Sequence, residues 1–97
     1  MIVRLTSRFH RDLHDIGDWV AQHDADAALR LTEALVEKAV GIADLPRGYA
    51  VVGRSGRSEL RKRSYGDYVI IYRLGSEVEV LRVVHVRRDY LTFLDKL

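Results

Sequence analysis

Two stretches in the last third of the chain are apolar on both of their faces. Residues 68–74 read YVIIYRL and residues 77–86 read EVEVLRVVHV. Simple alternation places Val80 and Val84 on one face of the second stretch, with Leu81 and Val83 on the other. Strands of this kind belong to sheets that are covered on both sides. We therefore expect a helical layer over one face, and over the second the C-terminal tail, another copy or a partner chain.

The first half of the chain predicts two helices. Apolar residues recur at spacings of three and four from Phe9 to Val20, which predicts a helix at about residues 8–22 with Ser7 as its N-cap. The segment from His23 to Asp26 interrupts this pattern and offers two aspartates as caps. A second helix then continues to about Ala43, before Pro46. The short connection predicts an antiparallel helical hairpin.

Short strands are predicted around this hairpin, which gives a single α+β domain over residues 1–97. The order is an N-terminal strand, the antiparallel helical hairpin, a three-stranded antiparallel meander and a short C-terminal segment. The strands are expected at residues 2–6, 58–64, 68–74 and 77–86, with a short helix at residues 89–97. Residues 44–57 are expected to be a loop, within which Tyr49-Ala-Val-Val52 could pack or pair.

Composition and charge limit the cellular compartment and the kinds of partner that we expect. The chain has no cysteine, which excludes disulfides and suits a reducing cytoplasm. It opens without an apolar signal core and has no uninterrupted apolar run near the roughly 18 residues that a membrane span needs. Residues 1–46 carry 5 basic and 8 acidic side chains, whereas residues 47–97 carry 11 basic and 6 acidic. The sheet-forming half should therefore attract nucleic acid or an acidic protein.

Basic side chains from three separate segments form the main candidate site. They predict an anion-binding groove over the sheet, because Arg is suited to bidentate contacts with phosphate or carboxylate. The alternative is a solvated strand edge that Lys and Arg protect from aggregation. The members are Arg54, Arg57, Arg61, Lys62, Arg63, Arg82, Arg87 and Arg88.

For the other candidate residues, we expect structural rather than functional roles. His85 is expected to be a hydrogen-bonded structural histidine, although its pKa would suit proton transfer. His10 and His14 are four residues apart but lack the glutamate of a zinc protease motif, so we expect an exposed pair. Trp19 borders the apolar stripe and should pack in the core or close the helical hairpin. Residues 53–56 form a flexible basic loop rather than a nucleotide motif, and no metal or cofactor is expected.

The order of these segments resembles the ParE/RelE superfamily of bacterial toxins from type II toxin–antitoxin modules. The most specific pieces are Tyr68-Val-Ile-Ile-Tyr-Arg73 and Val84-His-Val-Arg-Arg-Asp89, and the resemblance covers nearly the whole chain. It implies a RelE/ParE-like fold and a cognate antitoxin whose C-terminal segment wraps around the toxin. The resemblance and the doubly apolar sheet together place the antitoxin contacts at Tyr68, Ile70, Tyr72, Leu81, Val83 and Phe93.

Two mechanisms occur in the superfamily. RelE-like members cut mRNA on the ribosome, and the residues that could supply this chemistry here are Lys62, Arg63, Arg87 or Arg88, and Tyr90. Val69 departs from that branch, whose nucleases tend to carry arginine there. ParE-like members inhibit DNA gyrase without catalytic residues of their own.

The ending Val-His-Val-Arg-Arg-Asp looks more like the ParE branch, which often has His-Gly-Arg-Arg-Asp, although Val86 replaces the glycine. We therefore prefer a gyrase-inhibiting toxin that is not an enzyme. An mRNA endonuclease and an inactive homologue that still binds antitoxin remain alternatives. The residues expected to contact the target are Arg61, Arg63, Arg82, Arg87, Arg88 and Tyr90.

Overall fold

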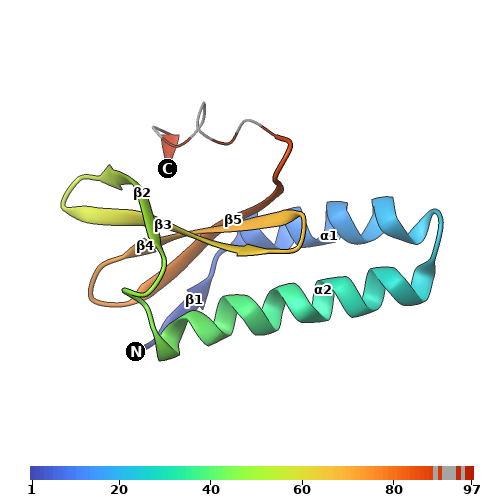
Figure 1. The fold of residues 1–97 in the computed structure, drawn as a ribbon, viewed down its shortest axis with the longest axis horizontal. Coiled ribbons are helices and arrows are strands. Elements are labelled where there is room, and N and C mark those ends of the chain that lie inside the picture. The colour runs from blue at the N-terminus through green and yellow to red at the C-terminus, as the bar shows by residue number, and fades with distance from the viewer. Residues whose placement is uncertain (89, 91–93, 95) are drawn as a thin grey trace.

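One mixed sheet of five strands carries a pair of helices across one of its faces (Figure 1). The computed structural model describes residues 1–88, 90, 94, 96 and 97. The elements, in order, are β1 (Val3–Leu5), α1 (Ser7–Ala21), α2 (Ala25–Val40), the 3-10 helix η1 (Gly41–Asp44), β2 (Ala50–Ser55), β3 (Ser58–Tyr65), β4 (Tyr68–Leu74) and β5 (Val78–His85). The two helices and the three later strands lie where the sequence predicts them.

The sheet is larger than the expected meander. Its order is β1-β5-β4-β3-β2, with β2 to β5 antiparallel and β1 parallel to β5. Strand β2 lies inside the segment expected to be a loop, where residues 49–52 were considered able to pack or pair. The loop expectation was therefore wrong for residues 50–55, and the pairing of Ala50 and Val51 agrees with the alternative. Its first residues pair with β3, and the Arg61 guanidinium anchors the preceding turn by donating to the carbonyls of Arg47 and Tyr49.

Side-chain caps fix where the helices begin. Thr6, and not Ser7, caps α1, because its hydroxyl accepts from the Phe9 N–H at 3.2 Å. Asp24 caps α2 by accepting from the Ala27 N–H at 2.9 Å, as the sequence indicates. Both caps satisfy backbone donors that the first helical turn leaves without partners.

The main core lies between the helices and one face of the sheet. Phe9 of α1 and Leu35 of α2 are fully buried against Ile70 and Tyr72 of β4 and Val80 of β5. The Tyr72 hydroxyl donates to the Pro46 carbonyl at 2.5 Å, and burial raises the pKa of Tyr72 to about 12. Tyr72 is therefore neutral and hydrogen-bonded throughout the physiological range.

A bulge in β5 changes which side chains face the helices. Ile71 pairs with Arg82 but the next residue, Tyr72, pairs with Val80, so Leu81 is an extra residue in β5. Beyond it the alternation is shifted by one position. Val83 therefore joins Val80 under the helices, and Val84 joins Leu81 on the opposite face. Simple alternation had placed both Val83 and Val84 on the wrong faces.

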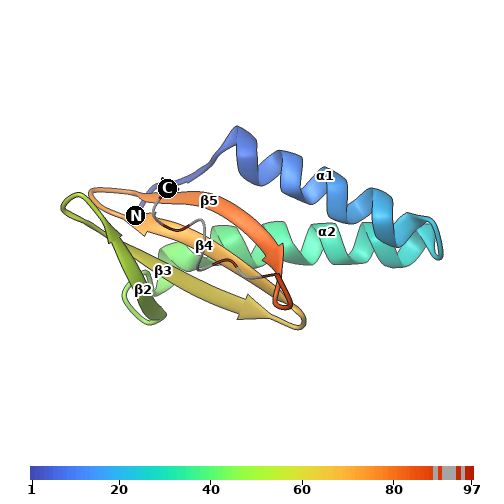
Figure 2. The ribbon, with the colours of Figure 1, turned by 90° about the horizontal axis from the view of Figure 1, so that it is seen from above.

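The second face of the sheet has a smaller apolar cluster of its own. Its buried members are Leu60, Val69, Ile71, Leu81, Val84 and Leu94. Tyr90 and Leu97 also pack against it, so residues near the C-terminus lie across the face opposite the helices (Figures 1 and 2). Of the three coverings considered from the sequence, the tail is the one present. The short helix expected at residues 89–97 lies largely outside the described residues.

Candidate functional site: the groove between α1 and β5

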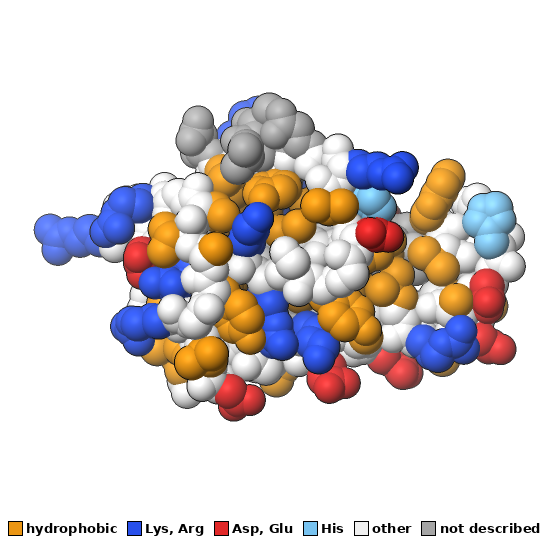
Figure 3. Space-filling model, in the orientation of Figure 1, with side chains coloured by type: hydrophobic (Ala, Val, Ile, Leu, Met, Phe, Trp, Pro, Cys, Tyr) orange, Lys and Arg blue, Asp and Glu red, His pale blue; other side chains and the backbone are white. Residues whose placement is uncertain are grey.

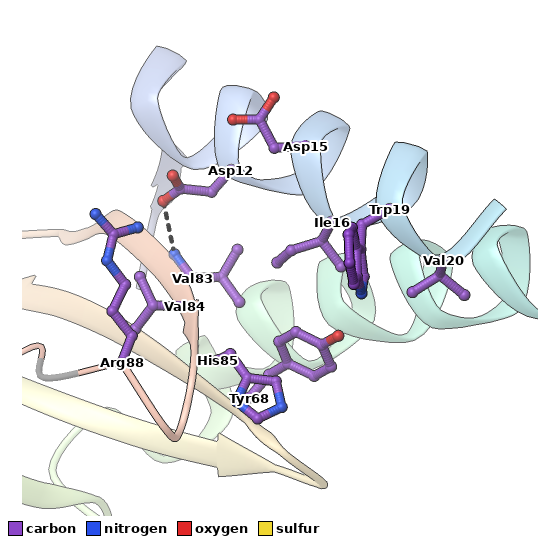
Figure 4. A pocket seen from close by; sticks show the side chains of 10 residues that line it. All are labelled: Asp12, Asp15, Ile16, Trp19, Val20, Tyr68, Val83, Val84, His85 and Arg88. Atoms are coloured by element: carbon purple, nitrogen blue, oxygen red, sulfur yellow. Dashed lines mark hydrogen bonds between the residues drawn. The ribbon is translucent and has the colours of Figure 1, made fainter. Parts of the chain in front are cut away.

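A groove of about 530 Å³ opens between α1 and the end of the sheet (Figure 4). The α1 wall is formed by Asp12, Asp15, Ile16, Trp19 and Val20. The sheet wall is formed by Tyr68 of β4 with Val83, Val84 and His85 of β5, and Arg88 follows them. The side chains of Ile16 and Trp19 point from the helix toward Tyr68 and His85 (Figure 4).

The part of the α1 wall formed by Ile16, Trp19 and Val20 is apolar and partly open to solvent. Trp19 is 65% exposed, so the expectation that it packs in the core was wrong. The reason is visible in Figure 1, where the helical pair continues past the ends of the strands. No sheet covers the last turns of α1, although Ile16, Trp19 and Val20 still follow one another at helical spacing. An apolar surface of this kind commonly marks an interaction site.

A buried ion pair fixes α1 against β5 at one end of the groove. Arg82 Nε donates to Asp12 Oδ2 at 2.7 Å, and its Nη2 donates to Oδ1 at 3.1 Å. The Val83 N–H donates to the same carboxylate at 3.1 Å. Asp12 is 8% and Arg82 6% exposed, so both charges are enclosed within the fold. The sequence led us to expect that Arg82 contacts a target. Its guanidinium instead joins α1 to β5.

Nδ1 of the His85 ring is bound to the backbone. Nδ1 accepts from the Arg87 N–H at 3.0 Å, and the ring meets Tyr68 edge-on at 5.4 Å between centroids. The expectation of a hydrogen-bonded histidine is confirmed, although the side chain also lines the groove. Because Nδ1 is an acceptor, the neutral ring carries its proton on Nε2. Burial raises the pKa of Tyr68, and the nearby Asp67 adds to this effect.

The predicted basic cluster is divided between framework and surface. Arg61 is 9% exposed and donates to Glu59 as well as to the carbonyls that hold the start of β2. Its hydrogen bond holds the pKa of Glu59 below the usual range. Arg87 and Arg88, by contrast, are exposed just after β5. In Figure 3, Lys and Arg side chains gather over the end of the sheet formed by β2 and β3.

The residues considered for RNA cleavage lie on two different faces of the sheet. Lys62 donates to the Tyr90 hydroxyl at 3.1 Å on the second face. Arg63 lies on the helical side, where it donates to the Lys38 carbonyl at 2.7 Å and stacks 4.9 Å from the Tyr49 ring centre. Within this set, the structure describes a direct contact between Lys62 and Tyr90.

Most of the residues expected to contact an antitoxin are inside the fold. Ile70, Tyr72 and Val83 are enclosed beneath the helices, and Leu81 is buried in the second-face cluster. Tyr68 is half-buried in the groove, while Phe93 lies outside the described residues. The sequence reasoning missed the groove because its α1 wall was assigned to the core. No local signal marked it, because an apolar stripe at helical spacing has the same pattern whether or not a sheet covers it.

The remaining candidates add no second site. His10 and His14 are both exposed, as expected, and His14 lies 3.3 Å from Asp18. Residues 53–56 belong to the β2–β3 hairpin, whose turn places Gly56 at a φ of 61°. The described residues contain no group of three or more side chains able to hold a metal. Within the same residues, no helix is long and apolar enough to span a bilayer.

Similarity to known proteins decides the family. The sequence family described as "ParE toxin of type II toxin-antitoxin system, parDE" matches residues 3–90. The chain belongs to the ParE toxin family. It is 32% identical over 91 residues to the Y4kP protein of Sinorhizobium fredii, which is named as a toxin, with 91% of each chain covered. It is 34% identical over 87 residues to Toxin ParE1 of Caulobacter vibrioides, covering 84% of this chain and 85% of that one.

Solved structures share the ParE fold. The chromosomal ParDE toxin–antitoxin system from P. aeruginosa matches with a TM-score of 0.70 at 19% identity, covering 88% of this chain and 95% of that one. The RelBE2 toxin–antitoxin complex from Mycobacterium tuberculosis matches with a TM-score of 0.59 at 29% identity, covering 86% and 87%. The expected RelE/ParE-like α+β fold is thus confirmed, with a mixed rather than a purely antiparallel sheet.

Proposed function

We propose that this ParE toxin acts in the bacterial cytoplasm by inhibiting DNA gyrase, and that a cognate antitoxin neutralises it. Membership of the ParE family supports the toxin role. The observation that carries the choice of target is the distribution of the arginines. Arg61 and Arg82 are engaged in the framework, whereas Arg87 and Arg88 are exposed together beyond β5.

This exposed pair supplies positive charge where a target can reach it. Arginine side chains at a surface steer association with anionic partners and form bidentate contacts with carboxylate or phosphate. A gyrase–DNA complex offers both groups. Inhibition by contact also needs no catalytic constellation, which agrees with the separation of Arg63 from Lys62 and Tyr90 across the sheet.

The contact between Lys62 and Tyr90 favours mRNA cleavage as a second candidate. A lysine and a tyrosine 3.1 Å apart could exchange a proton and stabilise phosphate charge. Against this function, Arg82 is bound to Asp12 and Arg63 faces the helices, so fewer cations remain for a phosphorane. Gyrase inhibition remains the better supported function.

A supercoiling assay tests the proposal. Purified toxin should abolish gyrase supercoiling and leave trapped, linearised plasmid. The variant Arg87→Glu/Arg88→Glu should need at least about tenfold more protein for the same effect, since two favourable contacts become repulsive. Arg11→Glu/Arg30→Glu is the matched control, because it makes the same charge change at exposed helical positions and should remain as active as wild type.

The contrary outcomes separate the alternatives. Unimpaired gyrase in the presence of folded wild-type toxin that binds antitoxin would overturn the choice of target. Ribosome-dependent mRNA cleavage that is lost in Lys62→Ala and Tyr90→Phe would then establish the nuclease. Neither activity, with antitoxin binding intact, would identify an inactive homologue.

A further inference from the structure

We infer that the hairpin formed by β2 and β3, together with the turn before it, binds duplex DNA. Three exposed arginines contact the phosphates there, namely Arg47, Arg54 and Arg57. The inference rests on the proposed inhibition of gyrase and extends it, because the toxin then contacts the DNA that gyrase holds as well as the enzyme itself.

The β2–β3 hairpin lies at the opposite end of the molecule from the turn between α1 and α2 (Figure 1). Basic side chains project from this end (Figure 3). Ser55 pairs with Ser58, so the hairpin turn is two residues long, and Gly56 takes the positive φ of 61° that such a turn favours at its first position. Arg57 is the second residue of the turn, and its side chain is exposed at the tip of the hairpin.

Neighbouring carboxylates do not neutralise these arginines. Arg54 pairs with Glu59 across the two strands, but Glu59 already accepts from Arg61 at 2.9 Å. The pKa of this carboxyl group is lowered first by the bond from Arg61 and then by the charges of Arg54 and Arg47. Several guanidinium groups thus surround one acid. Among the residues that the structure describes, none of Arg47, Arg54 and Arg57 forms an ion pair, so the hairpin keeps an excess of positive charge.

Duplex DNA fits both the shape and the charge of this hairpin. A two-stranded ribbon is narrow enough to enter the major groove, and arginines on it can form bidentate contacts with phosphates. DNA carries one negative charge per about 1.7 Å of helix axis, so the turn before β2 and the tip of the hairpin can both meet phosphates. Contacts of this kind position the protein on DNA and carry no sequence preference.

The hairpin tip and the exposed pair Arg87 and Arg88 lie at opposite ends of the strands. Strand β3 begins at the hairpin turn and ends beside the start of β4, where Tyr68 pairs with His85 of β5. Because β3 has eight residues, its two ends are about 23 Å apart. One toxin molecule can therefore contact gyrase with the arginine pair and DNA with the hairpin. Two linked contacts bind more tightly than either contact alone.

The salt dependence of DNA binding by the toxin alone tests the hairpin. With three phosphate contacts, the affinity for a fluorescent duplex of about 20 base pairs should fall about 40-fold between roughly 50 and 200 mM salt. Arg54→Gln/Arg57→Gln removes two contacts, so the fall should shrink to about fourfold. Arg11→Gln/Arg30→Gln is the matched control, because it removes the same charge from exposed helical positions and should behave like wild type. Thermal unfolding of each variant checks that the fold is intact.

Binding to immobilised gyrase, with and without bound DNA, tests the double contact. Wild-type toxin should bind the gyrase–DNA complex at least about tenfold more tightly than gyrase alone, because the hairpin adds a second contact. In Arg54→Gln/Arg57→Gln this gain should disappear, so that the two Kd values agree within about twofold. The control Arg11→Gln/Arg30→Gln should keep the gain.

The outcomes distinguish this inference from the function on which it rests. Wild-type toxin that inhibits gyrase but does not bind the duplex, or a hairpin variant that binds DNA as tightly as wild type, would overturn the inference and leave the function intact. Toxin that binds DNA as expected but does not affect gyrase would support the DNA surface and overturn the choice of target. A hairpin variant that loses affinity for the antitoxin, with DNA affinity unchanged, would assign the surface to an acidic protein and overturn the inference.

Discussion

The arginines of this toxin have the same chemistry but different surroundings. Arg82 is enclosed by its bond to Asp12, Arg61 holds the turn before β2, and Arg87 is exposed. Sequence reasoning grouped them because each lies in or beside a basic strand. Their different roles depend on partners about 70 residues away for Arg82 and 12 to 14 for Arg61, which local patterns do not reveal.

Breaking the Asp12–Arg82 pair should strongly destabilise the fold. Asp12→Ala would leave the guanidinium enclosed without its carboxylate, and removing one partner of a buried pair costs about 3 to 5 kcal/mol. Denaturant unfolding monitored by circular dichroism measures this loss. Arg8→Ala is the control, because Arg8 is half-exposed at 3.6 Å from Asp12 and should contribute less than about 1 kcal/mol. A loss below 1 kcal/mol for Asp12→Ala would contradict the enclosed pair.

At the scale of elements, patterns with a regular period were read correctly and irregular ones were not. The helices follow from apolar spacing, and β3 to β5 follow from β-branched and aromatic runs between turns. Strand β2 was missed because glycine and a proline nearby indicated a loop. The bulge at Leu81 was missed because an extra residue in a strand leaves the composition unchanged.

The Asp24 cap gives a prediction at this scale. Asp24→Ala removes the oxygen that accepts from the Ala27 N–H, and the loss of such a cap typically lowers the free energy of unfolding by about 1 kcal/mol. Asp26→Ala serves as comparison. Asp26 is exposed in the first turn of α2, where it contributes only through the helix dipole, so its removal should cost less. Equal losses in the two variants would argue against the cap.

The whole molecule is three layers deep, with helices, sheet and a C-terminal covering. The sequence indicated that both faces of the sheet must be covered and left open what covers the second. The tail contributes Leu94, whose exposed fraction is only 7%, to the buried cluster that contains Val69 and Ile71. The site was harder to predict than the layers. The groove lies where α1 continues past the ends of the strands, and this depends on how the helix and the sheet are placed relative to each other.

Truncating Leu94 tests the third layer. Leu94→Ala should lower the free energy of unfolding by about 2 to 3 kcal/mol, as expected for a buried leucine that leaves a cavity. Lys96→Ala, two residues away at an exposed position, should change it by less than about 0.5 kcal/mol. Chemical denaturation provides both values. Equal stability of the two variants would indicate that the tail does not contribute to the core.

The parallel pairing of β1 with β5 has a consequence for how the toxin is made. Strand β1 pairs with β5, which follows it by more than 70 residues, through Val3 beside Val78 and Leu5 beside Val80. Helix α1 likewise obtains its anchor only when Arg82 has been added. Contacts this distant in sequence form late and slowly. A growing chain therefore cannot complete this fold, or bring Arg82 to Asp12, until β5 has left the ribosome.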